Sequence, residues 1–240
     1  MEQLVFYLPL LAILIFSNFI QAITGFGGVI LALALGALIY PLSNITFIVI
    51  FITLFSSLGM ILTLKNKKSL EYFYKSLLPI FLMGVLIGWI MKYLFFVPAG
   101  KKIFAVLIML TVFLIKFRFT NLPKSTSKLF LLMAGMVHIF YASAGPFVMA
   151  SLNIANAPKE IVRGALAYLW FWMDLFFLIN YALINKEQVY PNPLVFLVGI
   201  GVVLLSFKLG NFYASKLSQN TFEKLCLGLL FVASIIIFFQ

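Results

Sequence analysis

Long apolar runs separated by short polar connections set the pattern of this chain. Runs of about 20 uncharged residues are long enough to cross a membrane as helices, and they follow one another along the sequence. The continuous runs expected to form spans are residues 45–64, 72–96, 103–119, 161–184, 193–213 and 222–239. The pattern therefore predicts an all-α polytopic membrane protein with about 8–10 membrane segments.

Glycines interrupt two further apolar stretches. The first stretch would make a straight rod of about 55 Å, roughly twice the hydrocarbon thickness of a bilayer. It is broken at Ile23–Val29 (ITGFGGV), where three glycines occupy four successive positions. Residues 4–20 and 27–40 are therefore predicted to form a hairpin or re-entrant pair. A weaker copy of the break, Tyr141–Phe147 (YASAGPF), lies in the second half of the chain.

Each half of the chain is thus predicted to be a broken helix pair followed by three spans. The halves are residues 1–120 and 121–240, joined by a basic linker over residues 116–128. A hairpin returns the chain to its starting side and three spans do not, so the two repeats are expected to be inverted. If each broken pair is instead one kinked crossing, the repeats are parallel. In the inverted arrangement 13 of the 17 lysines and arginines fall on one side of the membrane. Because basic residues are enriched on the cytoplasmic side, that side is expected to be cytoplasmic and both termini are expected outside.

Composition narrows the class of protein. With 64% apolar and 10% charged residues, the chain is not a water-soluble globule. The net charge of +11 is spread over short connections, which indicates anionic lipid headgroups as partners and argues against nucleic acid. The single cysteine, Cys226, excludes an intrachain disulfide and any paired-cysteine site. One histidine, one cysteine and one intramembrane aspartate fall short of a catalytic cluster, so no enzyme activity, catalytic residue, cofactor or metal is expected.

The two breaks are the candidate solute site. Matched interruptions in two halves of a membrane chain point to a transporter's binding site. A short helix that begins at a break presents unpaired N–H donors and about half a unit of positive charge, which suits an oxyanion. Gln21, Thr24 and Ser143 are expected to add neutral donors. The alternative explanation of the glycines is close helix packing, as expected for Gly84 and Gly88, which are spaced one turn apart.

Three ionisable residues leave alternatives open. His138, the only histidine, is either a structural hydrogen-bonding residue or a group that binds the anion or carries a proton. Apart from Glu223 at the second position of the last span, Asp174 is the only acidic residue inside a predicted span, so it is expected to pair with Lys208 or Arg163 or to be protonated, with proton coupling as the functional alternative. Arg163 either marks the cytoplasmic end of its span or binds a sulfonate through two hydrogen bonds.

Residues in both halves carry a resemblance to a known family: Gln21 with Thr24–Gly27, then Gly135, His138, Gly145, Pro146 and Arg163. They resemble the pattern of the sulfite exporter TauE/SafE family, in which a Gln precedes a Gly-Phe-Gly break and a second-half His precedes a Gly-Gly-Pro-like break and an Arg. The resemblance covers nearly the whole chain and implies export of small anions, commonly sulfur oxyanions or organosulfonates. The second break departs from that pattern, because Ala142 stands where a further glycine is common, so a tighter or weaker half-site is expected there.

The resulting hypothesis is a multi-pass transporter of the cell membrane that exports sulfite or an organosulfonate by alternating access around the two breaks. An anion channel, or a transporter of another small organic anion or ion, is the alternative. Its predicted partners are a small anionic solute and membrane lipids, and homo-oligomerisation is left open. The predicted solute-binding residues are Gln21, Thr24, Gly25, Phe26, Gly27, Gly28, His138, Ser143, Ala144, Gly145, Pro146 and Arg163, and the proton-coupling candidates are His138 and Asp174.

Overall fold

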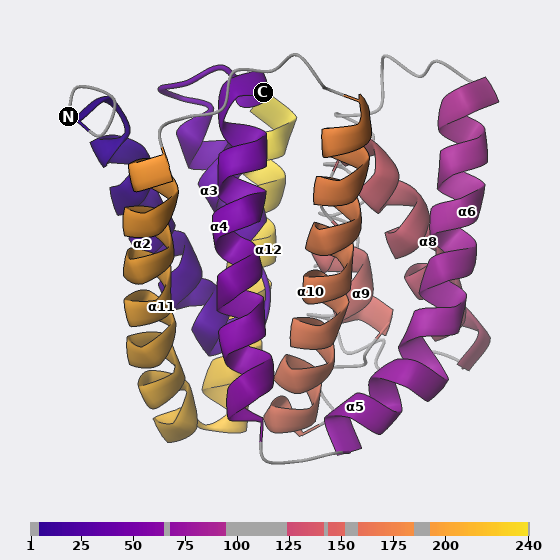
Figure 1. The fold of residues 1–240 in the computed structure, drawn as a ribbon. Coiled ribbons are helices and arrows are strands. Elements are labelled where there is room, and N and C mark those ends of the chain that lie inside the picture. The colour runs from indigo at the N-terminus through magenta and orange to yellow at the C-terminus, as the bar shows by residue number, and fades with distance from the viewer. Residues whose placement is uncertain are drawn as a thin grey trace. The chain divides into compact units, whose positions relative to one another are not determined.

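Helices account for all the regular secondary structure in the described part of the chain. The computed structural model describes residues 5–64, 68–94, 124–141, 144–151, 158–184 and 193–239. The helices, labelled in Figure 1, are α2 (Leu8–Thr24), α3 (Gly28–Gly36), α4 (Leu42–Thr63), α5 (Lys68–Tyr72), α6 (Leu78–Leu94), α8 (Lys124–Tyr141), α9 (Gly145–Ser151), α10 (Lys159–Ile184), α11 (Pro193–Lys216) and α12 (Gln219–Phe239). A π-helical segment, η1 (Phe73–Leu77), joins α5 to α6.

Several helices are long and apolar enough to cross a membrane. Within the described residues, four stretches meet both criteria: Asn44–Thr63, Leu70–Met91, Lys159–Ile179 and Pro193–Lys216. Two shorter apolar helices cover Leu8–Thr24 and Ser125–Ile139. The predicted all-α polytopic membrane class is therefore confirmed.

One predicted span cannot be compared with the structure. The span predicted over residues 103–119 and most of the basic linker lie outside the described residues. The end of that linker is helical, because α8 begins at Lys124.

The described helices group into two compact units. The first contains Met1–Lys65 and Leu166–Leu217, and the second contains Asn66–Ala165 and Ser218–Gln240. Each unit takes segments from both halves of the sequence, and α10 contributes residues to both. The division into two sequence repeats, 1–120 and 121–240, stays a prediction, because grouping by contacts does not measure internal symmetry.

The first unit contains an antiparallel helix hairpin. The α2 and α3 helices pack together, and Tyr40, just after α3, donates a hydrogen bond of 2.6 Å to the Phe6 carbonyl oxygen. The Tyr40 ring also stacks on Tyr7 with centroids 5.9 Å apart. The outer ends of the pair therefore meet on one side, and the glycine break forms the other end. The apolar core shared by α2, α3, α4 and α11 includes Leu10, Leu14, Ala32, Ile45, Ile48, Ile52 and Val203.

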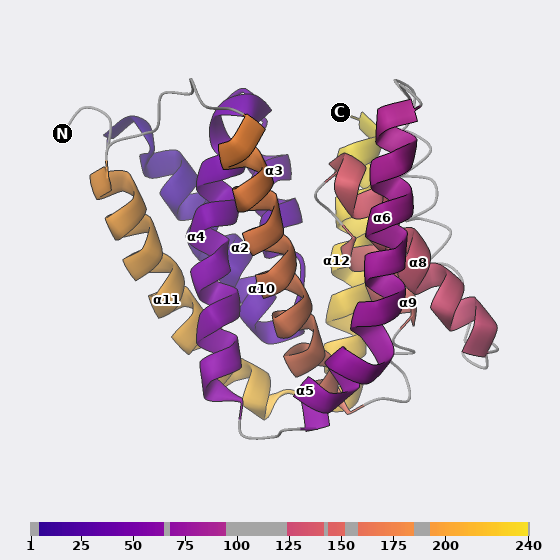
Figure 2. The ribbon, with the colours of Figure 1, turned by 45° about the vertical axis from the view of Figure 1, so that its right-hand side comes forward.

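In the second unit, α6 and α8 lie side by side at a glycine-lined contact (Figure 2). An added Cβ at Gly84 would overlap the Leu132 carbonyl oxygen, and one at Gly88 would lie 2.7 Å from the Met136 carbonyl oxygen. From the opposite side, a Cβ at Gly135 would lie 2.7 Å from the Val85 nitrogen. These contacts agree with the close packing that the spacing of Gly84 and Gly88 predicts.

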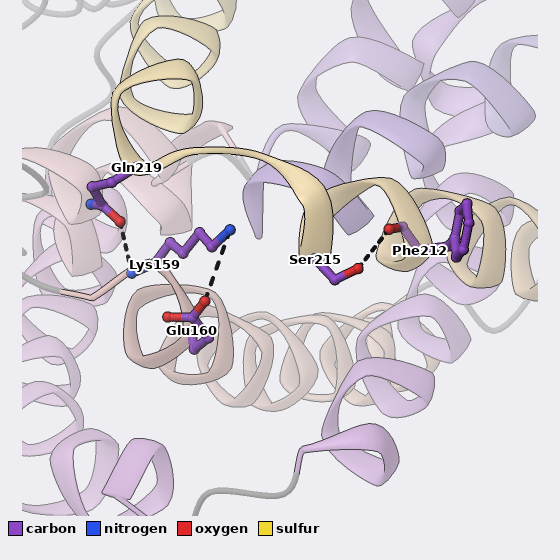
Figure 3. Close-up of polar contacts among 5 residues, drawn as sticks. All are labelled: Lys159, Glu160, Phe212, Ser215 and Gln219. Carbon is purple, nitrogen blue, oxygen red and sulfur yellow. Dashed lines mark hydrogen bonds and ion pairs between the residues drawn. The ribbon is translucent and has the colours of Figure 1, made fainter.

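The starts of α10 and α12 are linked by a side chain in the second unit. The backbone N–H of Lys159 donates to Oε1 of Gln219 at 3.2 Å, and Lys159 Nζ lies 3.9 Å from a Glu160 carboxylate oxygen (Figure 3). The Gln219 side chain thus satisfies one of the amides that a helix start leaves without a partner.

Candidate anion site at the first glycine break

The first break needs glycine for its backbone conformation. Helix α2 ends at Thr24 and α3 begins at Gly28. Between them Gly25 has φ 85° and Gly27 has φ 93°, and both are left-handed. A residue with a side chain pays about 1–2 kcal/mol in that region. These two glycines are therefore explained by the chain reversal, and helix packing is not needed to account for them.

Gly28 has a different reason to lack a side chain. A Cβ at this position would overlap Oε1 of Gln21 and lie 2.8 Å from its Cδ. Gln21 is 3% exposed, and its Nε2 donates to Ser57 Oγ of α4 at 3.3 Å. The missing side chain of Gly28 therefore leaves room for the carboxamide of Gln21 at the start of α3.

A ring of hydrogen bonds braces the break. The Gly25 N–H donates to the Gln21 carbonyl oxygen at 2.7 Å, and the Gly25 carbonyl oxygen accepts from Trp170 Nε1 at 2.7 Å. Thr24 Oγ1 lies 2.8 Å from the carbonyl oxygens of both Ile20 and Phe26. Because a hydroxyl has one proton, Thr24 donates to one of these carbonyls at a time and has none left for a solute. Thr24 therefore holds the shape of the break, and its role as a solute donor stays a prediction.

The start of α3 offers free main-chain donors. Its N-cap, Gly27, makes no side-chain capping bond, and the first intrahelical bond is from Leu31 N–H to the Gly27 carbonyl oxygen at 2.9 Å. The amides of residues 28–30 therefore have no acceptor within their own helix. No Asp, Glu, Lys, Arg or His occurs in residues 3–64, so no side-chain charge in this stretch competes with the partial positive charge of the helix start.

Buried polar side chains accompany the break on α2 and α4. Asn18 and Ser56 are both fully buried. Among the described residues, neither Asn18 Oδ1 nor Ser56 Oγ has a hydrogen-bond partner. Unsatisfied buried polar atoms cost about 1–3 kcal/mol each. The region next to the break thus keeps polar groups at a cost in stability, which is typical of a functional site.

The second break lies in the second unit, and its description is less complete. Helix α8 ends at Tyr141 and α9 begins at Gly145, while Ser143 lies outside the described residues. Ala144 is fully buried, and its carbonyl oxygen accepts from Val148 N–H at 3.1 Å. The side chain of Pro146 is likewise outside what the structure describes. The structure thus shows a helix start at Gly145 but not the donors predicted around it.

His138 lies in the contact between α8 and α6. It is 8% exposed, and its ring centroid lies 6.4 Å from that of Phe81 on α6. It follows Gly135 by one turn on the same face of α8. Its Nδ1 has no hydrogen-bond partner among the described residues. This placement suits a buried packing role and leaves one ring nitrogen available, so both predicted roles stay open.

Arg163 and Asp174 are both buried on α10. Arg163 is 9% exposed and Asp174 is 4% exposed. They are 11 residues apart on one helix, about 16 Å, so they do not pair with each other. Lys208 is exposed and makes no ion pair with Asp174, so neither predicted ion-pair partner of Asp174 is found in the described part of the chain.

Sequence reasoning missed two residues that hold the break. Trp170 is 145 residues from Gly25, and Ser57 is 36 residues from Gln21. No local spacing links either pair. The nearest sequence signal was the presence of hydroxyl and indole donors inside apolar runs, where such groups need a partner.

The apolar helices and the interrupted hairpin define a multi-pass membrane protein. A family model described as Sulfite exporter TauE/SafE matches residues 10–237 of the 240-residue chain. The chain belongs to this family, which confirms the predicted resemblance. No curated relative and no solved structure matches the chain.

Proposed function

We propose that this protein exports a small sulfur oxyanion or organosulfonate across the plasma membrane by alternating access. The observation that carries the proposal is the uncapped start of α3 at the glycine break. Free amides at a helix start, with no side-chain charge in residues 3–64, favour an oxyanion without a buried lysine. Membership of the sulfite exporter family supports the same class of solute.

Each residue of the first break has a proposed part in binding. Gly25 and Gly27 turn the chain so that α3 begins beside the Gln21 side chain of α2. Gln21 is poised next to those amides and reaches the anion by exchanging its bond to Ser57 for one to the solute. Thr24 and Phe26 hold the loop in shape, since both are buried and Thr24 bonds within the loop.

The second break is proposed as a further anion-binding element. Ser143, Ala144, Gly145 and Pro146 correspond to the first break by position in the repeat, and Arg163 adds a guanidinium that can bind a sulfonate through two hydrogen bonds. The support for this assignment is the sequence repeat together with the burial of Ala144 and Arg163. His138, one to two turns before the break, is proposed to bind or to orient the anion there.

Flux of radiolabelled sulfite in proteoliposomes tests the proposal. We expect saturable sulfite flux that sulfoacetate and thiosulfate inhibit and a neutral solute does not. Preloaded sulfite should also accelerate entry of labelled sulfite, since counter-transport distinguishes a carrier from a channel. Gly201→Ala should transport sulfite like wild type and so serves as the control for glycine substitutions in the breaks. Gly201 is exposed on α11, and a Cβ added there would meet nothing within 4 Å. Folded wild-type protein with no flux of any sulfur anion would refute the assignment.

A further inference from the structure

Asp174 is a buried carboxylate without a described counter-charge. It is 4% exposed, and its Oδ2 has no hydrogen-bond partner among the described residues. Residues 3–64, which form α2, α3 and α4, contain no acidic or basic residue. The lysines of α11, Lys208 and Lys216, are both exposed, and Lys216 lies 3.9 Å above the Phe212 ring. An unpaired carboxylate charge is costly inside a membrane, so the neutral, protonated form is favoured here.

Other titratable groups of the described first unit do not replace that counter-charge. They are phenols, which carry no positive charge in either protonation state. These phenols belong to Tyr7, Tyr40, Tyr168, Tyr181 and Tyr213. Asp174 is therefore the only carboxylate in the described part of this unit.

Asp174 lies on the face of α10 that contacts α4. The Tyr181 ring is 5.1 Å from the Phe47 ring of α4, and Ala167 shares a buried cluster with Met60 of the same helix. Positions 167, 174 and 181 are seven residues apart, which places them on one face of an α-helix. A ring contact with α4 thus lies on one side of Asp174 along this face, and a buried cluster that includes a residue of α4 lies on the other.

The same two contacts give the level of Asp174 along α4. The helices run antiparallel, because position 181 lies against position 47 and position 167 clusters with position 60. Asp174 is midway between the α10 positions, so it lies level with residues 53–54 of α4. Thr53 is fully buried, and the buried hydroxyls of Ser56 and Ser57 follow within about one turn. Ser57 accepts the hydrogen bond from Gln21, so this polar face of α4 leads to the break.

A direct link also joins α10 to the break. Trp170 lies one turn before Asp174 on the same face, and its Nε1 donates to the Gly25 carbonyl oxygen at 2.7 Å. A movement of α10 that accompanies a charge change at Asp174 therefore pulls on the left-handed residue that shapes the break.

We propose that Asp174 carries the proton that drives anion export, with Trp170 as the positioning residue that links it to the anion site. The inference rests on the proposed function. A proton from outside joins the Asp174 carboxylate, forming its O–H bond, while the anion leaves. The carboxylic acid then releases that proton to the inside, and the Ser56 hydroxyl of α4, which has no partner among the described residues, stabilises the carboxylate with entering water until the next cycle. One proton enters for each turnover that exports an anion.

A permanently ionised probe separates this coupling from protonation of the solute. Proteoliposomes with an acidic interior, clamped at zero membrane potential, are given a radiolabelled alkanesulfonate whose sulfonate group stays ionised throughout. Wild-type protein should accumulate it several-fold above equilibrium, while a pH dye reports proton exit. Asp174→Asn should reduce accumulation several-fold, down to the equilibrium level, within the range of coupling between two sites, yet keep exchange at equal pH within about twofold. Asp174→Glu should restore part of the accumulation.

Matched controls and contrary outcomes follow from the structure. Glu71→Gln removes an exposed carboxylate and should behave as wild type. Trp170→Phe should lower accumulation more than exchange, whereas Trp172→Phe, on an exposed part of the same helix, should change neither.

Accumulation that follows a sodium gradient, or that survives in Asp174→Asn, overturns the proposal. Folded Asp174→Asn protein that loses exchange together with accumulation also overturns it, because Asp174 is then structural. Wild-type protein without exchange of any sulfur anion refutes the proposed function instead, and the coupling with it.

Discussion

The glycines of the α2–α3 break and those between α6 and α8 lack a side chain for opposite physical reasons. Gly27 has an unusual conformation in open space, since its φ is +93° and the nearest atom to an added Cβ is Leu31 Cδ1 at 4.0 Å. Gly84 is helical, but an added Cβ would overlap backbone atoms of α8. One site uses glycine's conformational freedom, and the other uses its small size. The same residue type in an apolar run thus serves chain reversal in one place and helix packing in the other.

The largest expected effect is at the α6–α8 contact. Gly84→Ala should lower the free energy of unfolding by about 3 kcal/mol, because the new methyl group meets the Leu132 carbonyl and the Gly135 backbone, which cannot rotate away. The measurement is the melting temperature of the purified protein in detergent, together with the folded fraction after size-exclusion chromatography.

Gly201→Ala is the matched control for this prediction. Gly201 is helical and exposed, and its added Cβ would meet nothing within 4 Å. Alanine should be neutral there or stabilise by up to about 1 kcal/mol, through helix propensity alone. Equal melting temperatures for Gly84→Ala and wild type would show that α6 and α8 do not approach as closely as the structure has them.

A smaller and different effect is expected at the break. Gly27→Ala should cost about 1–2 kcal/mol from backbone strain, although there is room for the methyl group. Gly27→Asn should cost less despite its larger side chain, because asparagine tolerates left-handed backbone conformations. Sulfite exchange in proteoliposomes should follow the same order, with wild type fastest, then Asn, then Ala.

If side-chain size decided stability, Gly27→Asn would be less stable than Gly27→Ala. If backbone conformation decides it, the order is reversed, so each variant is the control for the other. If Gly27→Asn is more damaging than Gly27→Ala, the site is limited by space, and the distinction from Gly84 fails. The same two substitutions at Gly84 should rank by size, with asparagine worse than alanine.

Much of this comparison could be predicted from local sequence. Clustered glycines at Gly25–Gly28 indicate a chain break, and the four-residue spacing of Gly84 and Gly88 indicates helix packing, because both patterns depend on neighbouring residues alone. The first apolar run was predicted to end at residue 20, with the break at Ile23–Val29, and the structure extends α2 to Thr24. The difference arises because Thr24 bonds back to the Ile20 carbonyl and so completes the last turn.

The remaining features depend on distant contacts that spacing does not report. Nothing local to Gly25 predicts that Trp170 binds its carbonyl oxygen, and nothing local to Gly28 shows that it makes room for Gln21. Thr24 was predicted to be a solute donor because its hydroxyl stands beside the glycines. The structure uses that hydroxyl's proton on backbone carbonyls, a choice that follows from the left-handed turn.

Substitution of Gly28 has the smallest expected effect on stability. It is also the sharpest test of the comparison, because Gly28 lies within the break yet lacks a side chain for reasons of space. The atoms that a new methyl group would meet belong to the flexible Gln21 side chain and not to backbone. Gly28→Ala should therefore cost about 1 kcal/mol, less than Gly84→Ala, as Gln21 swings away and gives up its bond to Ser57. Combining it with Gln21→Ala removes the obstacle, so the double variant should be more stable than the sum of the single effects predicts, by about 0.5–1 kcal/mol. Gly28→Ala combined with Gly201→Ala should be additive, because these residues share no contact. An additive result for the Gly28 and Gln21 pair as well would mean that the carboxamide does not occupy the start of α3, and the donors proposed for the anion would then have to be the amides of α3 alone.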